Sequence, residues 1–207
     1  LWMANRALAP VTNSDTGLYH MGAVMWNSTY PIVKGLGNLH GRFAFNNAHF
    51  LYVALLDVGP WTDRAYHLAN GFLITALMVQ AVLGLRAAVA ERRQVYVGAF
   101  LLALMLGPIL QIASSPNVTS FSADYAIAVL GIVLLQQLAL FVALNNPSDA
   151  EERFLVFCIF ALASLGVTIK LSFAAFAAAA CLAAFWIWYR RKPLRPGSRS
   201  ARGILKT

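Results

Sequence analysis

Charged side chains are scarce in this sequence. Of its 207 residues, only 12% are Asp, Glu, Lys or Arg, whereas 59% are hydrophobic. Soluble globular domains carry about 25% charged residues. The composition therefore argues against a soluble domain and predicts a chain embedded in lipid.

Cysteine is nearly absent as well. The two cysteines, Cys158 and Cys181, both lie inside apolar runs. Cysteines in such surroundings behave as small buried hydrophobic residues, so the sequence offers neither a disulfide framework nor a cysteine metal site. The four histidines, at positions 20, 40, 49 and 67, match no H-x-x-x-H or H-E-x-x-H pattern. A dedicated histidine metal site is therefore not expected.

A signal peptide with a charged start and a cleavage site is also missing. The sequence begins with Leu1 rather than with methionine. We therefore expect a fragment of a longer membrane protein, with further membrane segments before Leu1 and after Thr207.

Basic residues outnumber acidic ones, with sixteen against eight, but seven of the sixteen lie after Tyr189. No folded basic module accompanies this tail, which argues against a nucleic-acid partner. A basic cluster directly after an apolar run instead fits a cytoplasmic tail beside anionic lipid headgroups. We expect residues 190–207 to form such a cytoplasmic tail or loop.

Long apolar runs follow one another after residue 65. A helix that crosses a membrane needs about 20 mostly apolar residues. Five stretches approach or reach that length, at residues 66–85, 95–113, 126–144, 154–169 and 171–189. The sequence thus predicts an all-α fold, a polytopic transmembrane helical bundle of five spans over residues 66–189.

The lysines and arginines between the predicted spans indicate an orientation. Eleven of them fall on the side of the basic tail and five on the other side, so the tail side is expected to be cytoplasmic. Residues 1–65 then form a long extracytoplasmic first loop. Within it, residues 47–56 are apolar but too short to span, so we expect an interfacial helix lying on the membrane.

One carboxylate stands alone in the stretch NSDTGLYHMGAVMW, where Asp15 is the only charged residue. Tyr19, Gly22 and Trp26 follow it at helical spacing. This spacing predicts one helix face that presents a carboxylate, a phenol and an indole. The simpler alternative is that Asp15 only caps the start of the helix, a common role for aspartate.

Three further charged residues lie on the same predicted outer side. Asp124 opens the third span, Lys170 lies in the short turn TIKLS between the last two spans, and Arg42 lies in NLHGRFAFNN of the first loop. Basic side chains in such places can bind phosphate, and an acid at a membrane helix end is a candidate functional group. The alternatives are a helix cap for Asp124, snorkelling to headgroups for Lys170 and a solvated charge for Arg42.

Taken together, these motifs resemble the GT-C glycosyltransferases, polytopic membrane enzymes that use lipid-phosphate sugar donors. The resemblance rests on DTGLYH, YPIVKG, GLGNLHGRFAFN, SSP with the later Asp124, and TIKLS. The sequence looks closest to the branch of protein O-mannosyltransferases and lipid A aminoarabinose transferases, and within it to a group of large bacterial membrane proteins. Many mannosyltransferase relatives carry Asp-Glu where this chain has Asp15-Thr16.

The resemblance implies a GT-C-like bundle in a bacterial inner membrane, with an inverting sugar transfer on the extracytoplasmic side. It implies Asp15 as the catalytic base, and Asp124 as a ligand of the acceptor or of a divalent cation such as Mg²⁺ or Mn²⁺. Arg42 and Lys170 would bind the phosphate. The residues that would line the sugar site are Tyr19, His20, Trp26 and His40. Membrane lipid and a lipid-linked sugar are the expected partners, and the acceptor would be an envelope glycan, lipid or protein.

Other functional classes stay open on the sequence alone. A polysaccharide polymerase or flippase would have a similar composition, and a transporter would also keep acidic and basic residues near its spans. Transporters usually carry broken helices at mid-membrane. The acids of this chain lie at span ends and in outer loops, which favours chemistry at the membrane surface. A catalytically inactive scaffold of the same fold is a further alternative, because fold does not determine function.

Overall fold

The computed structural model describes residues 1–45, 47–91, 106–107, 109–111, 114–144 and 147–191. This part of the chain consists of helices and loops and contains no strand. The predicted all-α fold is therefore confirmed for the residues described.

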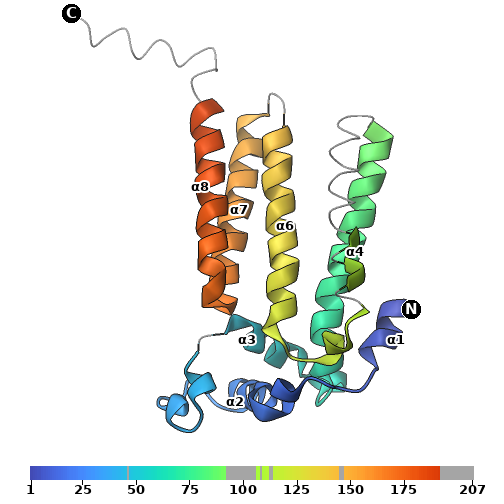
Figure 1. Cartoon of the computed structure of the whole chain (residues 1–207), viewed down its shortest axis with the longest axis vertical. Coiled ribbons are helices and arrows are strands. Elements are labelled where there is room, and N and C mark those ends of the chain that lie inside the picture. Colours follow the sequence, from blue (N-terminus) through green and yellow to red (C-terminus); the bar gives the residue numbers. More distant parts are fainter. Residues whose placement is uncertain (46, 92–105, 108, 112–113, 145–146, 192–207) are drawn as a thin grey trace, which may run out of the picture.

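The long helices of the described residues form a bundle (Figure 1). They are α4 (Ala65–Glu91), α6 (Ala123–Ala143), α7 (Asp149–Ile169) and α8 (Ala174–Arg191). Four segments are long and apolar enough to cross a membrane: Ala65–Arg86, Ala123–Ala143, Asp149–Ile169 and Leu171–Arg191. They correspond to four of the five predicted spans. The remaining predicted span, residues 95–113, lies mostly outside the described residues.

The ends of these helices follow from local sequence. Ser148 caps α7 with a complete capping box, in which its side chain accepts the Glu151 backbone N–H while the Glu151 carboxylate accepts the Ser148 N–H. Helix α7 therefore begins before residue 154, the start predicted from hydropathy. The first turn of α7 is acidic, which stabilises a helix N-terminus. Because these residues are polar, hydropathy alone does not include them in the helix.

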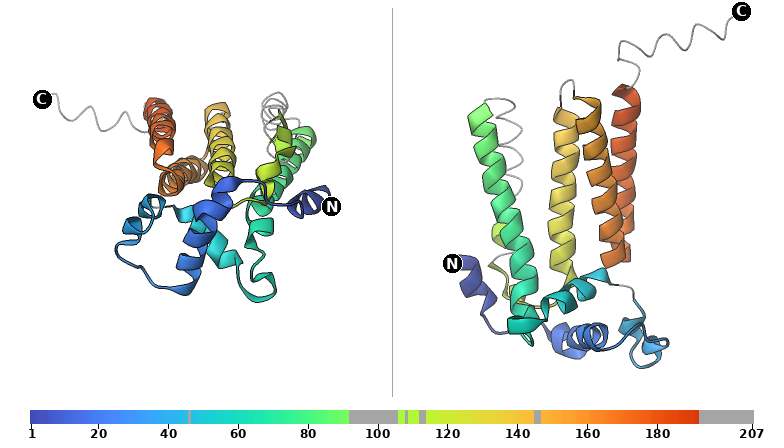
Figure 2. Two further views of the ribbon diagram at one scale, coloured as in Figure 1. Left: turned by 60° about the horizontal axis from the view of Figure 1, so that its bottom comes forward. Right: turned by 180° about the vertical axis from the view of Figure 1, so that it is seen from behind.

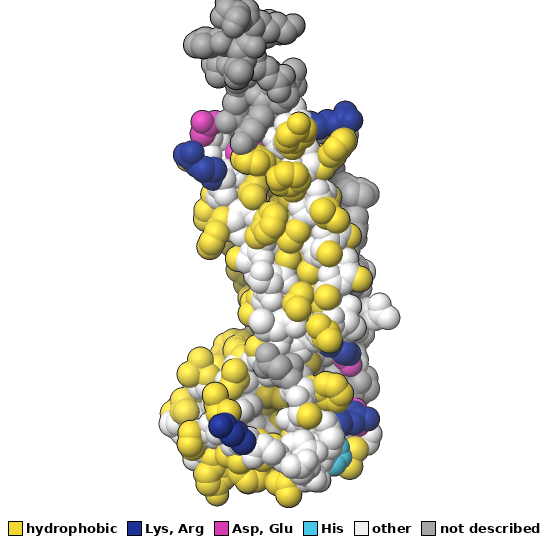
Figure 3. All heavy atoms as spheres, turned by 90° about the vertical axis from the view of Figure 1, so that its left-hand side faces the viewer, with side chains coloured by type: hydrophobic (Ala, Val, Ile, Leu, Met, Phe, Trp, Pro, Cys, Tyr) yellow, Lys and Arg dark blue, Asp and Glu magenta, His cyan; other side chains and the backbone are white. Residues whose placement is uncertain are grey.

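Helices α6, α7 and α8 share one apolar core. Small residues line α8 where it meets its neighbours, so the helix backbones can approach closely. The buried members of this core are Leu134, Phe141, Ile159, Ala163, Phe173, Ala177, Ala180 and Ala184. The face of the bundle seen in Figure 3 is largely hydrophobic along its length, and its charged side chains gather toward the ends. This distribution is the one expected of helices surrounded by lipid.

Residues 1–64 lie across one end of the bundle (Figure 2). The helical elements in this N-terminal segment are α1 (Trp2–Ala7), a π-helical turn η1 (Thr16–His20), α2 (Met21–Thr29), the 3-10 turns η2 (Leu36–Asn38) and η3 (Gly41–Ala44), α3 (Ala48–Leu56) and η4 (Gly59–Trp61). The expected helix at residues 47–56 is present as α3. Its inner face, which includes His49, Phe50 and Val53, is buried. That α3 lies on the membrane surface stays a prediction.

Two short turns complete the same end of the molecule. The turn η5 (Pro116–Thr119) precedes α6, and η6 (Leu171–Phe173) joins α7 to α8. Phe50 and Val53 of α3 pack in one core with Phe121, which lies in the loop between η5 and α6. The N-terminal segment is therefore fixed against the bundle by an apolar contact as well as by polar ones.

Candidate functional site

A cavity of about 790 Å³ lies where the N-terminal segment meets the end of the bundle. Four separate parts of the chain line it: residues just before η1 with the last two residues of η1, the stretch from Arg42 to Phe50, the start of α6, and the end of α7 with the turn to α8. We call it the charged cavity, because its lining residues include Asp15, Arg42, Asp124 and Lys170, together with Tyr19 and His20. The structure thus brings together all four charged residues that the sequence singled out.

The first pair of charges joins the N-terminal segment to itself. Arg42 Nη1 donates to Asp15 Oδ2 at 3.4 Å, and both side chains are partly exposed. The Arg42 guanidinium also lies 4.7 Å from the centroid of the Tyr19 ring, a cation–π geometry. Hydrogen bonding to Tyr19, followed by the negative charge of Asp15, raises the pKa of Arg42 further above its ordinary value. Arg42 is therefore a permanent cation at the cavity wall.

The Asp15 side chain does not cap the helix. It makes no capping hydrogen bond, and the Asn13 side chain takes that part by accepting the Asp15 backbone N–H at 2.9 Å. The capping alternative is therefore wrong for the Asp15 carboxylate, which instead faces Arg42. A π-helical turn follows directly, a rare conformation that often accompanies functional sites.

The second pair of charges joins two of the long apolar helices. The ammonium of Lys170, at the C-terminal end of α7, donates a hydrogen bond to Asp124 Oδ1 at the start of α6. The helix cap at this position is Ser122, whose hydroxyl accepts the Asp124 N–H at 3.3 Å and contacts Asp124 Oδ2 at 3.4 Å. Both charged side chains are largely exposed, so the pair contributes only about 0–1 kcal/mol to stability.

A buried amide holds the loop before α6 in place. Asn70 of α4 is fully buried, and its Nδ2 donates to the carbonyls of Ser120 and Ser122 at 2.8 and 3.3 Å. These bonds fix the residues just ahead of Asp124 and thereby position that carboxylate at the cavity. No motif in the sequence predicts this role for Asn70, although an amide inside an otherwise apolar span is a visible signal.

Two buried histidines lie at the charged cavity, His20 in its lining and His49 outside the lining. His20 is 4% exposed and His49 1% exposed, and His20 Nδ1 and His49 Nε2 have no hydrogen-bond partner in the described part of the chain. Burial lowers the pKa of His49 to about 4, with a smaller effect from His20, and burial also lowers the pKa of His20. Both rings are therefore neutral near pH 7, and His20 can offer a ring nitrogen to a ligand.

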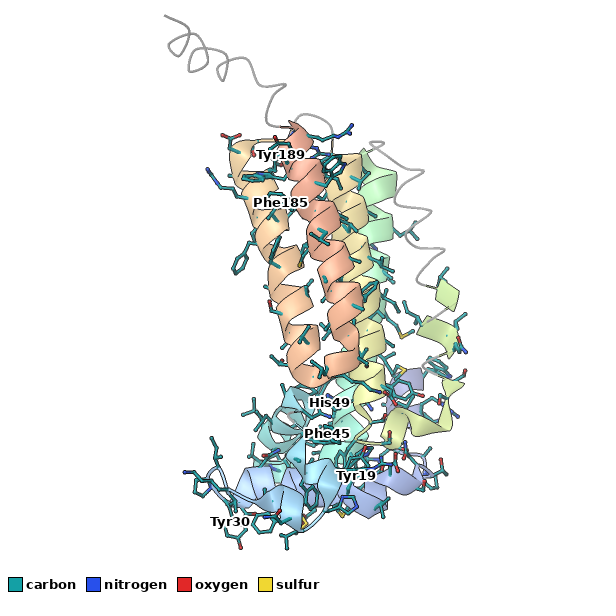
Figure 4. All side chains as sticks on the ribbon, turned by 60° about the vertical axis from the view of Figure 1, so that its left-hand side comes forward. Tyr19, Tyr30, Phe45, His49, Phe185 and Tyr189 are labelled. Atoms are coloured by element: carbon teal, nitrogen blue, oxygen red, sulfur yellow. The ribbon has the colours of Figure 1, made fainter. Side chains whose placement is uncertain are left out.

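Tyr19 and His40 complete the wall around Arg42. Their rings stack with centroids 6.1 Å apart and planes 10° apart, and His40 Nδ1 accepts the Arg42 backbone N–H at 3.3 Å. Figure 4 shows Tyr19, Phe45 and His49 near the end of the bundle, whereas Tyr30 lies at the outer edge of the N-terminal segment. His40 thus acts on the cavity through Arg42 and Tyr19 rather than by lining it.

Trp26 lies elsewhere. It lines a second cavity, beside Tyr30, and not the charged cavity. The predicted single face from Asp15 to Trp26 assumed a continuous α-helix. The intervening π-helical turn winds the chain less per residue than an α-helix does, so Trp26 is rotated away from the Asp15 side.

The carboxylates do not form a ready cage for a divalent cation. Among the described residues, no three His, Cys, Asp or Glu side chains lie close enough together to hold a metal ion. The two oxygens of Asp124 already face Lys170 and Ser122. The donor set at Asp124 therefore does not fit Mg²⁺ or Mn²⁺ as the chain stands, and we derive no step through a metal.

Over the residues that the structure describes, the protein is helical and has four helices long and apolar enough to cross a membrane, with a charged cavity at one end of the bundle. The chain belongs to a family described as a domain of unknown function (DUF8201), which matches residues 1–195. Neither a curated protein nor a solved structure matches the chain.

Proposed function

We propose that this protein is an integral membrane glycosyltransferase that moves a sugar from a polyprenyl-phosphate donor to an acceptor of the cell envelope. The observation that carries the proposal is the charged cavity, in which Asp15 with Arg42 and Asp124 with Lys170 meet at the end of an apolar bundle. We place the cavity on the extracytoplasmic side of a bacterial plasma membrane, because most of the basic residues fall on the opposite side.

The pairing of the charges suits a site that binds an anion, because an anionic ligand can replace Asp15 and Asp124 as the partner of the two cations. A guanidinium binds phosphate oxygens bidentately, and an ammonium adds a second positive charge. When the donor phosphate engages Arg42 and Lys170, it competes with Asp15 and Asp124 for them. Asp15 is then released as a free carboxylate beside the bound donor. Donor binding therefore prepares the base.

Sugar transfer follows as one displacement. The Asp15 carboxylate takes the proton of the acceptor hydroxyl or amine while the acceptor atom attacks the anomeric carbon. The bond from that carbon to the phosphate oxygen breaks, and the electron pair leaves with the phosphate, whose charge Arg42 and Lys170 stabilise. The anomeric configuration inverts. Asp124 orients the acceptor, and His20 and Tyr19 line the space that the sugar occupies.

The position of the cavity favours this reaction over transport. Transporters place their sites near mid-membrane, typically at broken helices. Here the charged groups lie at the start of α6 and in the α7–α8 turn, and α6 and α7 run without interruption through their described lengths. A site at the end of a bundle serves a substrate whose head group lies at the membrane surface.

The Asp15→Asn variant tests the proposal. The full-length protein, reconstituted in lipid, is given a panel of polyprenyl-phosphate sugars, and sugar transfer and donor binding are measured separately. We expect the variant to bind donor but to lose transfer by about 10²–10⁴-fold, the usual contribution of a general base. Asp63→Asn is the matched control. Asp63 is exposed outside the cavity and has a φ of 63°, a conformation that asparagine also accepts.

Each other result has a definite meaning. Unchanged transfer in Asp15→Asn would remove Asp15 from the reaction and make Asp124 the next carboxylate to replace. Absence of transfer from every donor in the wild-type protein would overturn the proposal in favour of a polymerase, a flippase or a transporter.

A further inference from the structure

A second cavity of about 810 Å³ lies within the N-terminal segment, between α2 and the chain from Tyr30 to Phe45. We call it the aromatic cavity. Its wall includes Trp26, Tyr30, Phe43 and Phe45, together with the amides of Asn27 and Asn38. Cavities of this size hold small organic ligands. The sugar transfer proposed above does not use it.

Two aromatic rings stand one helical turn apart at the end of α2. The centroids of Trp26 and Tyr30 are 4.9 Å apart, with their planes tilted by 40°. Tyr30 is 55% exposed, so this pair is not part of an apolar core. Trp and Tyr combine a flat apolar face with a polar edge, which suits a ligand that has both C–H faces and hydroxyl groups.

Two amide side chains without an internal hydrogen-bond partner among the described residues lie in the same wall. The side chains of Asn27 and Asn38 make no hydrogen bond to the described part of the chain, so each offers a donor and an acceptor. Of the described residues that line this cavity, only Arg42 is charged. An anionic ligand would have one cation to bind, and an acyl chain would leave the amides unpaired. A neutral ligand with many hydroxyls matches both features.

The loop that forms the far wall is held close to the chain behind it. The Cα of Gly37 approaches Ala44 so closely that a methyl group there would lie 2.9 Å from the Ala44 Cβ. Gly35 has a φ of 88°, which favours glycine. Glycine at these two positions lets the turn fold back on residues 41–44. The shape of this wall therefore depends on the backbone conformation of the turn.

The aromatic cavity adjoins the charged cavity. The residues that line both are Arg42, Ala44, Phe45, Asn47 and Phe50. A ligand seated between Trp26 and Asn38 can therefore extend along this shared wall to Arg42, whose guanidinium meets Asp15. One elongated molecule can occupy the aromatic cavity and present its end to the charged one.

We propose that the aromatic cavity binds a neutral oligosaccharide, with sugar rings stacked on Trp26 and Tyr30 and hydroxyls bonded to Asn27 and Asn38. That the cavity binds such a glycan rests on its own geometry. That the glycan is the acceptor, directed with its terminal sugar toward Asp15, rests on the proposed glycosyl transfer.

An immobilised array of neutral oligosaccharides, built from hexose, N-acetylhexosamine, deoxyhexose and pentose units, tests the proposal. The full chain is applied in detergent, and the best-bound glycan is then titrated against each variant by calorimetry. We expect Trp26→Ala to raise Kd by about tenfold or more, and Asn38→Ala by about two- to tenfold. Trp61→Ala is the matched control, because Trp61 is exposed and lines neither cavity.

The exposed position of Asn38 guards against a folding artefact, because its side chain can be removed without loss of an internal hydrogen bond. Binding to no glycan of the array, or equal binding by wild type, Trp26→Ala and Asn38→Ala, would overturn the proposal. Asp15→Asn separates the two functional claims. Glycan binding that persists in this variant while transfer fails keeps the subsite. Glycan binding by wild type without transfer from any donor also keeps the subsite, but it overturns the proposed transfer and with it the acceptor role.

Discussion

His49 is the most completely buried titratable side chain near the charged cavity, and its ring touches two aromatic neighbours. It lies 6.4 Å from Phe50 and 5.7 Å from Tyr52, centroid to centroid, and His20 packs against the same Phe50 at 5.3 Å. A cation among these rings would lose its hydration. His49 therefore acts as a neutral part of the support beneath the site, and His20 as a neutral part of its lining.

This burial predicts a loss of stability in mild acid. The folded pKa of His49 is about 4, below its ordinary value of 6.5, so between these values the unfolded chain binds a proton that the folded chain does not. Stability is complete above pH 6.5 and falls as the pH drops, by about 3 kcal/mol at pH 4 for this group alone. Thermal unfolding in detergent, measured from pH 7.5 to 4.5, should show the midpoint falling.

The variant His49→Gln isolates this contribution. A glutamine does not titrate, so the midpoint should depend less steeply on pH, although its value at pH 7.5 can shift through altered packing. A pH dependence equal to that of wild type would contradict the assignment of the acid sensitivity to His49.

At the scale of single residues, the sequence identified the charges but not their partners. Asp15 and Asp124 were visible because few acids interrupt an apolar sequence. The pairs Asp15 with Arg42 and Asp124 with Lys170 span 27 and 46 residues, and no local pattern encodes such contacts. Trp26 was assigned to the wrong wall because a π-helical turn has no sequence signature that helical periodicity can detect.

At the scale of elements, α7 and α8 meet closely where the chain turns between them. Gly166 of α7 faces the ring of Phe173, and a methyl group at Gly166 would overlap that ring. Phe173 is itself buried and contacts the core shared with α6, so it has little room to move. This contact sets the distance between α7 and the turn that follows Lys170.

Gly166→Ala should therefore destabilise the protein by about 1–3 kcal/mol, the usual cost of overpacking. Gly131→Ala is the matched control on α6. A methyl group there would meet Phe173 and Phe176 at 3.8 and 3.9 Å, which is ordinary contact. Alanine is favoured over glycine inside a helix by about 0.5–1 kcal/mol, so this change should be neutral or stabilising. Thermal unfolding of both variants measures the difference, and equal midpoints would contradict it.

Elements were easier to predict than contacts. The spans at residues 66–85, 126–144 and 171–189 were visible because length and hydropathy alone define a helix that crosses lipid. The start of α7 was placed too late, since its capping box and acidic first turn are polar. The short turns η2 and η3 have no hydrophobic periodicity, so no sequence pattern predicts the aromatic cavity that they help to enclose.

For the whole molecule, the arrangement of charges predicts a sidedness. Lys34 lies in the N-terminal segment at one end of the bundle, and Ala150 lies near the start of α7 at the other. In a background with both native cysteines replaced by alanine, we expect a membrane-impermeant maleimide to label Lys34→Cys in spheroplasts. Ala150→Cys should react only after the membrane is opened. The opposite pattern would reverse the proposed orientation of the charged cavity.

The unequal chain separation of the two ion pairs has a consequence for biosynthesis. Asp15 and Arg42 both precede α4, so their pair requires none of the four apolar helices to have left the ribosome. Asp124 lies at the start of α6 and Lys170 at the end of α7, so the two residues meet at the open end of the α6–α7 hairpin. Their pair can form only when the whole hairpin is in place. In a nascent chain, both residues of the first pair are therefore synthesised before either residue of the second. The complete set of four charges therefore exists only in a chain whose α6–α7 hairpin has formed.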